Sequence, residues 1–324
     1  MKAIQVAALD GPASIELVEV PIPKPGPGEI RVEVAYAGVT FPELLQTRGL
    51  HQNRPTLPFV LGSESSGVVV EVGEGSKFSV GDRVVVVSGM GAFAEHVVVA
   101  DDKALPLPDN IRLAHGAGIP ANVLTADFSL RIRGDLQEGQ VVVVHGAAGG
   151  LGSAGVQLAL AMGAEVVAVV STDEKATMVQ ELGATHVVKA DRFKDAVLDL
   201  YPEGVDVVYD PVGGDRFTDS IRVLKPFGQI QVLGFTGGDI PTVKVNRLLL
   251  KNVSVIGVAL GAATVTKPQL VQEQWQSLNK HLTEEKLNPH IYGTYTLGEA
   301  HKALSALEER AVIGKVLIEV KPEM

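Results

Sequence analysis

The sequence predicts an α/β protein of two domains, one doubly wound around a parallel sheet and the other discontinuous, mainly β and barrel-like. Three observations lead to this class. The chain has 324 residues, which is enough for about two domains. Its first third holds short β-rich runs separated by Gly and Pro. From about residue 120 onward, apolar strand-like runs alternate with helical patterns.

The first domain is expected to begin with short strands joined by turns. The expected strands are Ile30–Tyr36, Gly67–Val72, Arg83–Val87 and Ala94–Val99. This spacing predicts an antiparallel, barrel-like arrangement. The stretch from Pro21 to Gly28 contains four prolines and predicts an extended surface crossing rather than a central strand.

The second domain is expected to contain five or six successive β/α units. Its strands are predicted at Val141–Val144, Val166–Val170, Val187–Val188, Val205–Tyr209, Ile230–Gly234 and Val253–Val258. Helices are expected over Gly152–Met162 and Asp173–Leu182. Continuous Val runs are typical of parallel strands that are covered on both faces, so a doubly wound sheet with right-handed crossovers follows.

The last sixty or so residues are expected to return to the first domain. Helical patterns cover Pro268–His281 and Leu297–Glu309, and a final strand is predicted at Lys315–Val320. We therefore expect residues 1–122 and 263–324 to form one domain, and residues 123–262 to form the other.

Composition excludes several classes of protein. The absence of cysteine excludes disulfides, thiolate metal ligation and a cysteine nucleophile. The formal net charge is -10 and no basic stripe occurs, so we expect no nucleic-acid partner. No run approaches the roughly 18 apolar residues of a membrane span. The start lacks signal-peptide features and residues 319–324 fit no targeting or lipidation signal, so we expect a cytoplasmic protein without a membrane partner.

A glycine-rich turn follows the first predicted parallel strand. Residues 146–152 read Gly-Ala-Ala-Gly-Gly-Leu-Gly and lead directly into a predicted helix. Small residues let the backbone approach a pyrophosphate, and the N-H groups at the helix start face its charge. Ala147 occupies the first glycine position of the dinucleotide-binding pattern, so the match is imperfect. The alternative is a tight turn that binds no ligand.

The residues after the second parallel strand select the nicotinamide nucleotide. An acidic residue there would bind the ribose hydroxyls of NADH. The strand Val166–Val170 is instead followed by Ser171 and Thr172, with Lys175 nearby. Hydroxyls and a lysine suit a 2′-phosphate, so the sequence favours NADPH. Asp173 is the feature that would suit NADH, which is the less favoured cofactor.

Stretches along the whole chain resemble the zinc-less quinone oxidoreductase branch of the medium-chain dehydrogenase/reductase superfamily. They are Gly38–Glu43, Leu57–Glu64, Gly81–Val84, Leu124–Ala126, Ala147–Gly152, Asp210–Gly214, Gly228–Phe235 and Gly314–Val316. The resemblance implies a central Rossmann cofactor domain and a GroES-like substrate domain. It also implies a homodimer joined through edge strands of the cofactor domains, with Lys244–Val258 supplying the edge.

The resemblance implies the site residues as well. The cofactor-binding residues would be Thr125, Ala147, Gly149, Gly150, Leu151, Gly152, Ser171, Thr172, Lys175, Val212, Gly213, Gly234 and Phe235. Ala190 stands where a Tyr often stacks near the adenosine phosphate, and Arg192 could compensate for it. Thr40 is the leading candidate to donate a hydrogen bond to the acceptor, with Arg48 and His51 as further catalytic candidates.

Zinc-dependent relatives place Cys near Thr40 and His at Ser63. This sequence has neither ligand there, so no metal is expected. Glu64 is expected to be a buried structural acid that pairs with an Arg or with backbone.

These residues predict a zinc-independent, NADPH-dependent oxidoreductase that transfers hydride to a small molecule, either a quinone or an α,β-unsaturated carbonyl (enone). Water can supply the proton, because no obligate acid is visible. Two alternatives remain open: an enoyl-thioester reductase on the same fold, and a non-catalytic NADPH-binding sensor or structural protein. The chain has no Lys/Arg cluster for the phosphate of an acyl carrier.

Overall fold

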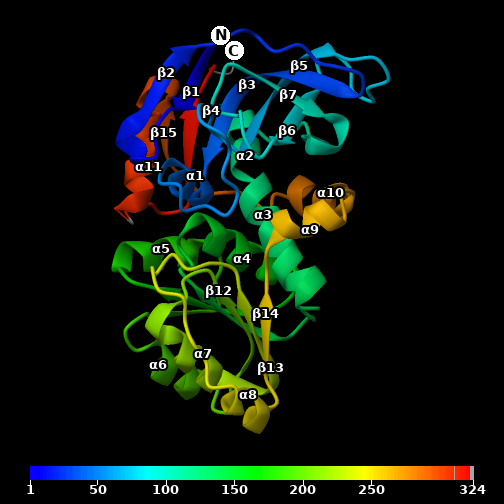
Figure 1. Ribbon diagram of the computed structural model, residues 1–324. Helices are drawn as coiled ribbons and strands as arrows, with labels where there is room; N and C mark the ends of the chain where they lie inside the picture. Colours follow the sequence, from blue (N-terminus) through cyan, green and yellow to red (C-terminus); the bar gives the residue numbers. More distant parts are fainter. Residues whose placement is uncertain (310, 322–324) are drawn as a thin grey trace. The chain divides into compact units, whose positions relative to one another are not determined.

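The computed structural model describes residues 1–309 and 311–321, so the segment 319–324 lies partly outside the described residues. The chain divides into two compact units. Unit 1 comprises Met1–Ala121 and Pro268–Met324, and unit 2 comprises Asn122–Lys267. Unit 1 is mainly β and unit 2 is built on a parallel sheet, which confirms the predicted fold class (Figure 1).

Unit 2 has a six-stranded sheet in the order β11-β10-β9-β12-β13-β14, and every pair in it is parallel. The strands are β9 (Val141–His145), β10 (Glu165–Val170), β11 (His186–Lys189), β12 (Val205–Asp210), β13 (Leu224–Val232) and β14 (Ser254–Gly257). Helices α4 (Gly150–Ala161), α5 (Asp173–Glu181), α6 (Phe193–Leu200), α7 (Phe217–Val223) and α8 (Asn246–Lys251) connect them and flank the sheet (Figure 1).

The strand order reverses beside β9, because the chain moves outward through β10 and β11 and then crosses to β12. All carboxyl ends lie at one edge of the sheet since the strands are parallel. Ligands of doubly wound sheets bind at this edge, where the order reverses. The glycine-rich turn follows β9 and therefore lies at the reversal.

Most boundaries in unit 2 lie within one residue of the prediction, and those of β13 and of the start of α4 differ by more. Strand β13 begins at Leu224 and ends at Val232, so Gly234 follows the strand instead of ending it. Helix α4 begins at Gly150, two residues earlier than expected. Glycine has a low propensity for both helices and strands, so the sequence did not mark the start of α4 at Gly150 or the end of β13 before Gly234. Unit 2 also contains α3 (Pro120–Asp127), most of whose residues belong to it, a π-helical segment η3 (Phe128–Arg133), and α9 (Leu260–Thr266).

Unit 1 contains a three-stranded sheet in the order β2-β1-β4 and a seven-stranded sheet in the order β15-β16-β3-β5-β6-β8, with β7 also paired to β3. The strands are β1 (Lys2–Val6), β2 (Ile15–Glu19), β3 (Glu29–Val39), β4 (Phe59–Val60), β5 (Glu64–Val72), β6 (Arg83–Val87), β7 (His96–Ala100), β8 (Ala104–Pro106), β15 (Ile291–Thr296) and β16 (Lys315–Glu319).

The final strand returns to unit 1, as predicted: β16 pairs antiparallel with β3. The strands predicted to be antiparallel do pair in this way, whereas β15, which was not predicted, runs parallel to β16. These two strands are joined through α11 (Ala300–Glu308), and a helical crossover of this kind connects parallel strands.

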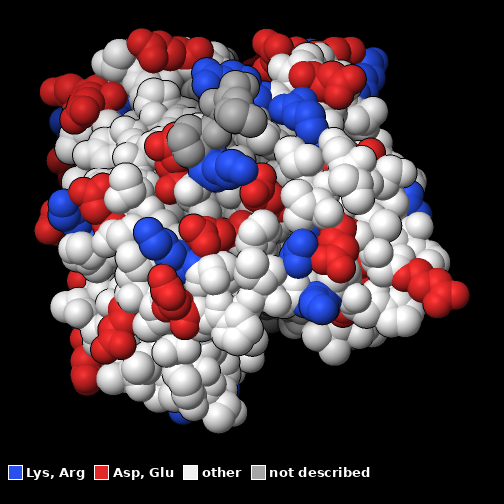
Figure 2. Space-filling view, turned by 90° about the horizontal axis from the view of Figure 1, so that it is seen from above, with Lys and Arg blue, Asp and Glu red and all other residues white. Residues whose placement is uncertain are grey.

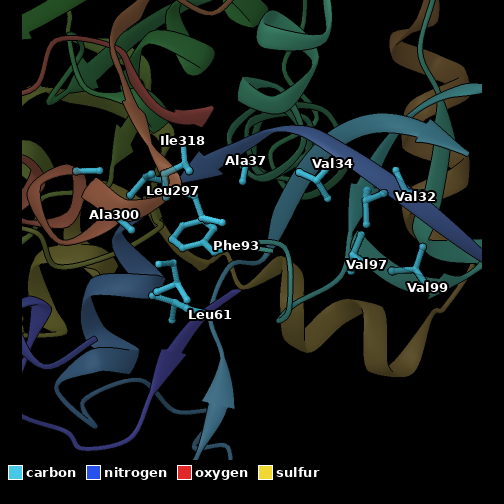
Figure 3. Close-up of a cluster of buried hydrophobic side chains, with 14 of the residues drawn as sticks. Val32, Val34, Ala37, Leu61, Phe93, Val97, Val99, Leu297, Ala300 and Ile318 are labelled. Carbon is cyan, nitrogen blue, oxygen red and sulfur yellow. The ribbon is translucent and has the colours of Figure 1, made fainter. Parts of the chain in front are cut away.

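The remaining helices of unit 1 are α1 (Phe41–Thr47), α2 (Leu113–Gly118) and α10 (Leu270–Thr283). Short 3-10 turns lie at Pro12–Ser14, Asp101–Lys103, Gly214–Arg216 and Leu297–Glu299, the third of them in unit 2. The core of unit 1 gathers side chains that are distant in sequence. Figure 3 shows Leu61, Phe93, Leu297 and Ile318 together, and all four are buried. Burial of these apolar groups stabilises the discontinuous unit.

On the face shown in Figure 2, Lys and Arg side chains are interspersed with Asp and Glu, in keeping with the formal net charge of -10. Within the described residues, no helix is long and apolar enough to cross a membrane.

Candidate functional site

The glycine-rich turn of unit 2 presents the start of α4 at the carboxyl edge of the sheet. Gly149 is the N-cap of α4 and provides no side-chain capping bond. The N-H groups of Gly150, Leu151 and Gly152 form the first turn, and the first N-H groups of a helix have no intrahelical acceptor. Gly149, Gly150 and Leu151 are partly exposed. This donor set fits a pyrophosphate.

Two glycines allow α4 to pack closely against the glycine-rich turn and against β12. A Cβ on Gly152 would lie 2.1 Å from the carbonyl oxygen of Gly146, and one on Gly155 would lie 2.9 Å from the Tyr209 ring on β12. Ala147 does not present a group to a ligand, because it is fully buried and its N-H donates to the carbonyl of Val169 at 3.2 Å. Its contribution is to fix the turn against β10.

The turn after β10 contains exposed Ser171 and Thr172. Thr172 caps α5 by accepting a hydrogen bond from the backbone N-H of Lys175 at 3.3 Å. The side chain of Asp173 forms an ion pair with Lys189 at 2.6 Å. This ion pair lowers the pKa of Asp173 below its ordinary value. Sequence reasoning missed Lys189, although its place at the end of the next strand was a usable signal.

The turns after β12 and β13 are joined by backbone hydrogen bonds. The N-H of Gly237 donates to the carbonyl of Val212 at 2.8 Å, and that of Gly214 donates to Asp239 at 3.1 Å. Gly213 has a φ of 65°, and a Cβ on it would lie 2.9 Å from the ring of Phe235. The structure therefore brings Val212, Gly213, Gly234 and Phe235 to the same edge as the glycine-rich turn.

Asp210, which sequence reasoning also missed, shapes the first of these turns. Its Oδ1 accepts hydrogen bonds from the N-H groups of Val212 and Gly213, both at 2.9 Å. Burial raises the pKa of Asp210, and these two N-H groups oppose the rise. Its place at the end of β12, two and three residues before its donors, is the pattern of an Asx turn.

His145 ends β9 beneath the glycine-rich turn. Its Nε2 lies 2.8 Å from the Ser220 hydroxyl on α7, and its ring packs edge-on against Phe193. The Ser220 hydroxyl donates its proton to the carbonyl of Arg216 at 3.1 Å. We therefore infer that Nε2 of His145 carries a hydrogen and donates it to the Ser220 oxygen. Burial, assisted by the charge of Arg216, lowers the pKa of His145 to about 3. His145 is therefore neutral near pH 7.

Thr125, the remaining expected cofactor contact, lies partly buried on α3.

In unit 1, Thr40 and Ser63 share one carboxylate. Glu43 accepts hydrogen bonds from the N-H and the hydroxyl of Thr40, and from the N-H and the hydroxyl of Ser63. Thr40 is the N-cap of α1 and Glu43 is its third residue, so the pair forms a capping box. Both Thr40 and Glu43 are buried. Sequence reasoning did not identify this role, although the Thr-x-x-Glu pattern signals it.

Glu64 is a buried structural acid, as expected, but its charged partner is Lys315 rather than an Arg. It also accepts the N-H of Ala121 at 2.6 Å. Burial raises the pKa of Glu64, and the charge of Lys315 opposes the rise. A Cβ on Gly38 would collide with Glu64 at 2.3 Å, so this glycine makes room for the pair.

The other two catalytic candidates have local partners. Arg48 is the C-cap of α1 and forms an ion pair with Glu308 on α11. His51 lies in the following loop, where its Nδ1 is 3.2 Å from both the backbone nitrogen and the carbonyl oxygen of Asn53. Thr40 and Arg48 lie at opposite ends of α1, and both Arg48 and His51 are bonded to groups other than Thr40.

The parts of the chain that the structure describes contain no group of three or more His, Asp or Glu side chains placed to hold a metal ion. At the Thr40 and Ser63 sites the donor set is two hydroxyls and one carboxylate. Catalytic zinc is usually held by imidazole and thiolate or carboxylate groups, so these residues do not fit it.

Comparisons with known proteins cover both units. The family described as "Alcohol dehydrogenase GroES-like domain" matches residues 26–109, and the family described as "Zinc-binding dehydrogenase" matches residues 150–281. Quinone oxidoreductase-like protein 2 of Bos taurus is 36% identical over 326 residues, covering 99% of this chain and 93% of that protein.

Solved structures agree over the same extent. A probable oxidoreductase of Mycobacterium abscessus is 38% identical, with a TM-score of 0.90 and coverage of 99% of both chains. The Escherichia coli quinone oxidoreductase complexed with NADPH is 28% identical, with a TM-score of 0.91 and coverage of 99% of this chain and 100% of that one.

Proposed function

The chain belongs to the quinone oxidoreductase-like branch of the medium-chain dehydrogenase/reductase superfamily, and on this premise we propose that it is a zinc-independent, NADPH-dependent oxidoreductase that reduces a quinone or an enone. The observation that carries the proposal is the start of α4. Its first three N-H groups lie at the reversal of strand order, and its N-cap is a glycine that leaves room for phosphate oxygens.

NADPH, when bound, supplies a hydride from its nicotinamide ring. The residues of this chain bind and orient it: Gly150–Gly152 would hold the pyrophosphate, and Val212, Gly213 and Phe235 would line the nicotinamide half. Holding both reactants in one geometry, away from water, lowers the barrier to transfer. We assign the Thr40 hydroxyl to the acceptor oxygen, where it would stabilise developing negative charge.

Two features support zinc independence. The sequence has no cysteine, and the Thr40 and Ser63 hydroxyls both donate hydrogen bonds to Glu43. A Zn²⁺ ion at this place would have to displace both of these hydrogen bonds, and it would gain one carboxylate and two weak hydroxyl ligands without any imidazole or thiolate.

We also propose a homodimer joined through β14. Strand β14 pairs with β13 on one side and has no strand on its other side among the described residues. Apolar side chains are exposed on and around it: Val245 (73%), Leu249 (75%), Leu250 (79%), Val255 (39%) and Val265 (83%). An unpaired strand edge bordered by exposed apolar groups is suited to pairing with a second copy.

Titration of the protein with NADPH and NADH, followed by nicotinamide fluorescence, tests the cofactor. We expect NADPH to bind more tightly, and the complex to be oxidised by 1,4-benzoquinone or by a simple enone. Activity only with an enoyl-thioester would favour the alternative reductase. Tight NADPH binding without turnover of any acceptor would favour a non-catalytic protein.

The variant Gly149→Asp tests whether the start of α4 binds the pyrophosphate. An Asp is a good N-cap and preserves α4, but it places a carboxylate where the pyrophosphate would bind. We expect both nucleotides to lose affinity by at least about 100-fold, with no fall in the unfolding temperature. Unchanged affinity in this variant would mean that the turn does not bind the cofactor.

A further inference from the structure

An exposed ion pair lies at the carboxyl edge of unit 2, one strand beyond the residues expected to recognise the adenosine ribose. Lys189 Nζ is 2.6 Å from Asp173 Oδ1. Lys189 is the last residue of β11, and Asp173 is the first residue of α5. The two residues therefore join two successive strand ends of the same sheet.

The register places this pair in line with the glycine-rich turn. Val170 of β10 lies opposite Lys189, and β10 lies directly between β9 and β11. Neighbouring strands are about 4.8 Å apart, so the end of β11 is about 10 Å from the end of β9. A nucleotide with its pyrophosphate at α4 can extend its ribose over that distance, past Ser171.

The ion pair contributes little to folding. The side chain of Asp173 is fully exposed and that of Lys189 is 42% exposed. Exposed pairs of this kind are screened by water and contribute little to stability. Lys189 can therefore exchange its carboxylate partner for another anion at small cost. A phosphate monoester, with a charge near −2, is the stronger partner for an ammonium group.

We propose that Lys189 is a specificity-determining residue that binds the 2′-phosphate of NADPH, and that Asp173 weakens this selectivity by competing for Lys189 and repelling the phosphate. This inference rests on the proposed function. Lys189 thereby supplies a cation next to Ala190, where the stacking Tyr of relatives is missing. In this proposal Asp173 lowers the affinity for NADPH and does not bind the ribose hydroxyls of NADH.

Equilibrium binding of NADPH, NADH and 2′,5′-ADP to four proteins tests the inference: the native protein, Lys189→Gln, Asp173→Asn and the double variant. For Lys189→Gln we expect about a tenfold loss of affinity for NADPH and for 2′,5′-ADP, the worth of one charge-assisted hydrogen bond. NADH affinity should stay within about twofold. For Asp173→Asn we expect NADPH to bind about threefold to tenfold more tightly, and this gain should disappear in the double variant.

Lys225→Gln is the matched control. Lys225 also forms a 2.6 Å ion pair, with Asp206, and is 43% exposed, but it lies at the opposite, amino-terminal edge of the sheet. It should leave the affinity for all three ligands unchanged.

Unchanged NADPH affinity in Lys189→Gln, while the native protein binds NADPH, would overturn this inference alone. Loss of NADH affinity in Asp173→Asn would overturn it too, because Asp173 would then bind the ribose hydroxyls. If the native protein binds neither nucleotide, the proposed function fails together with the inference.

Discussion

The single hydroxyl group of Thr40 has two possible acceptors, the Glu43 carboxylate and a substrate oxygen. Its proton is donated to Glu43, which also accepts the hydroxyl of Ser63. To donate to a substrate oxygen, the Thr40 hydroxyl must turn away from Glu43, which keeps its bond to the Thr40 N-H and both bonds from Ser63. Glu43 therefore holds α1 in place whether or not the hydroxyl turns.

Thr40→Val removes this hydroxyl while keeping the side-chain shape. We expect turnover to fall by at least about tenfold, because a donor to the developing negative charge is lost, whereas NADPH affinity stays unchanged. Thr40→Ser is the control, since it keeps the hydroxyl and should retain most of the activity. Steady-state kinetics together with NADPH titration check this. Native turnover in Thr40→Val would remove Thr40 from the mechanism.

At the scale of elements, strand β9 is joined to α6 and α7 by a neutral, buried imidazole. His145 contacts Ser220 on α7 and Phe193 on α6. Protonation would place an uncompensated charge in the core next to Arg216. The anchoring of β9, and of the glycine-rich turn that follows it, is therefore sensitive to acid.

The pKa of His145 is lowered from 6.5 to about 3 by folding, so protons bind preferentially to the unfolded chain. Its contribution to stability is complete above pH 6.5 and is lost as the pH falls towards 3. We expect a loss of about 2 kcal/mol by pH 5 relative to pH 7.5. Urea unfolding across this range measures the loss. His145→Gln, which keeps a donor for Ser220 but does not titrate, should show a flatter profile, and an equal slope would contradict the assignment.

The sequence predicted the elements of unit 2 better than those of unit 1. Strands β9, β10 and β12 are continuous Val-rich runs because they are covered on both faces, and such runs are visible without tertiary information. Strand β15 escaped prediction because Gly293 interrupts its residues Ile-Tyr-Gly-Thr-Tyr-Thr and none of them is fully buried, so the segment has no continuous apolar run. Its pairing with β16 is settled only by the fold.

The same contrast holds for the candidate site. The turn after β9 could be predicted because its chemistry lies in one continuous segment. The partners of Glu43, Glu64 and Lys189 lie up to 251 residues away in the chain, as for Glu64 and Lys315. Side-chain pairs of that kind depend on strand order and register, which a single sequence does not specify. Glu43 left a local signal in its capping box, and Lys189 left one in its place at the end of β11, but neither signal identified the partner residues in space.

At the scale of the whole molecule, the exposed apolar surface around β14 predicts the assembly state. Leu250 is 79% exposed, so Leu250→Asp should leave the folded subunit intact but disrupt a dimer formed through this edge. We expect sedimentation velocity at micromolar concentration to change from dimer to monomer. Val80→Asp, at a 64% exposed site in unit 1, is the control and should remain dimeric. A monomeric native protein would refute the proposed dimer.

The pairing of β16 with β3 has a consequence for biosynthesis. Val39 lies opposite Val316, so β3 has no partner along this part of its edge until almost the whole chain has left the ribosome. At ordinary translation rates that interval is on the order of tens of seconds. Unit 2 is contiguous and is complete before β16 is made. Nascent chains should therefore acquire a protease-resistant unit 2 while residues 36–39 of β3 are still unpaired along this edge and open to chaperones.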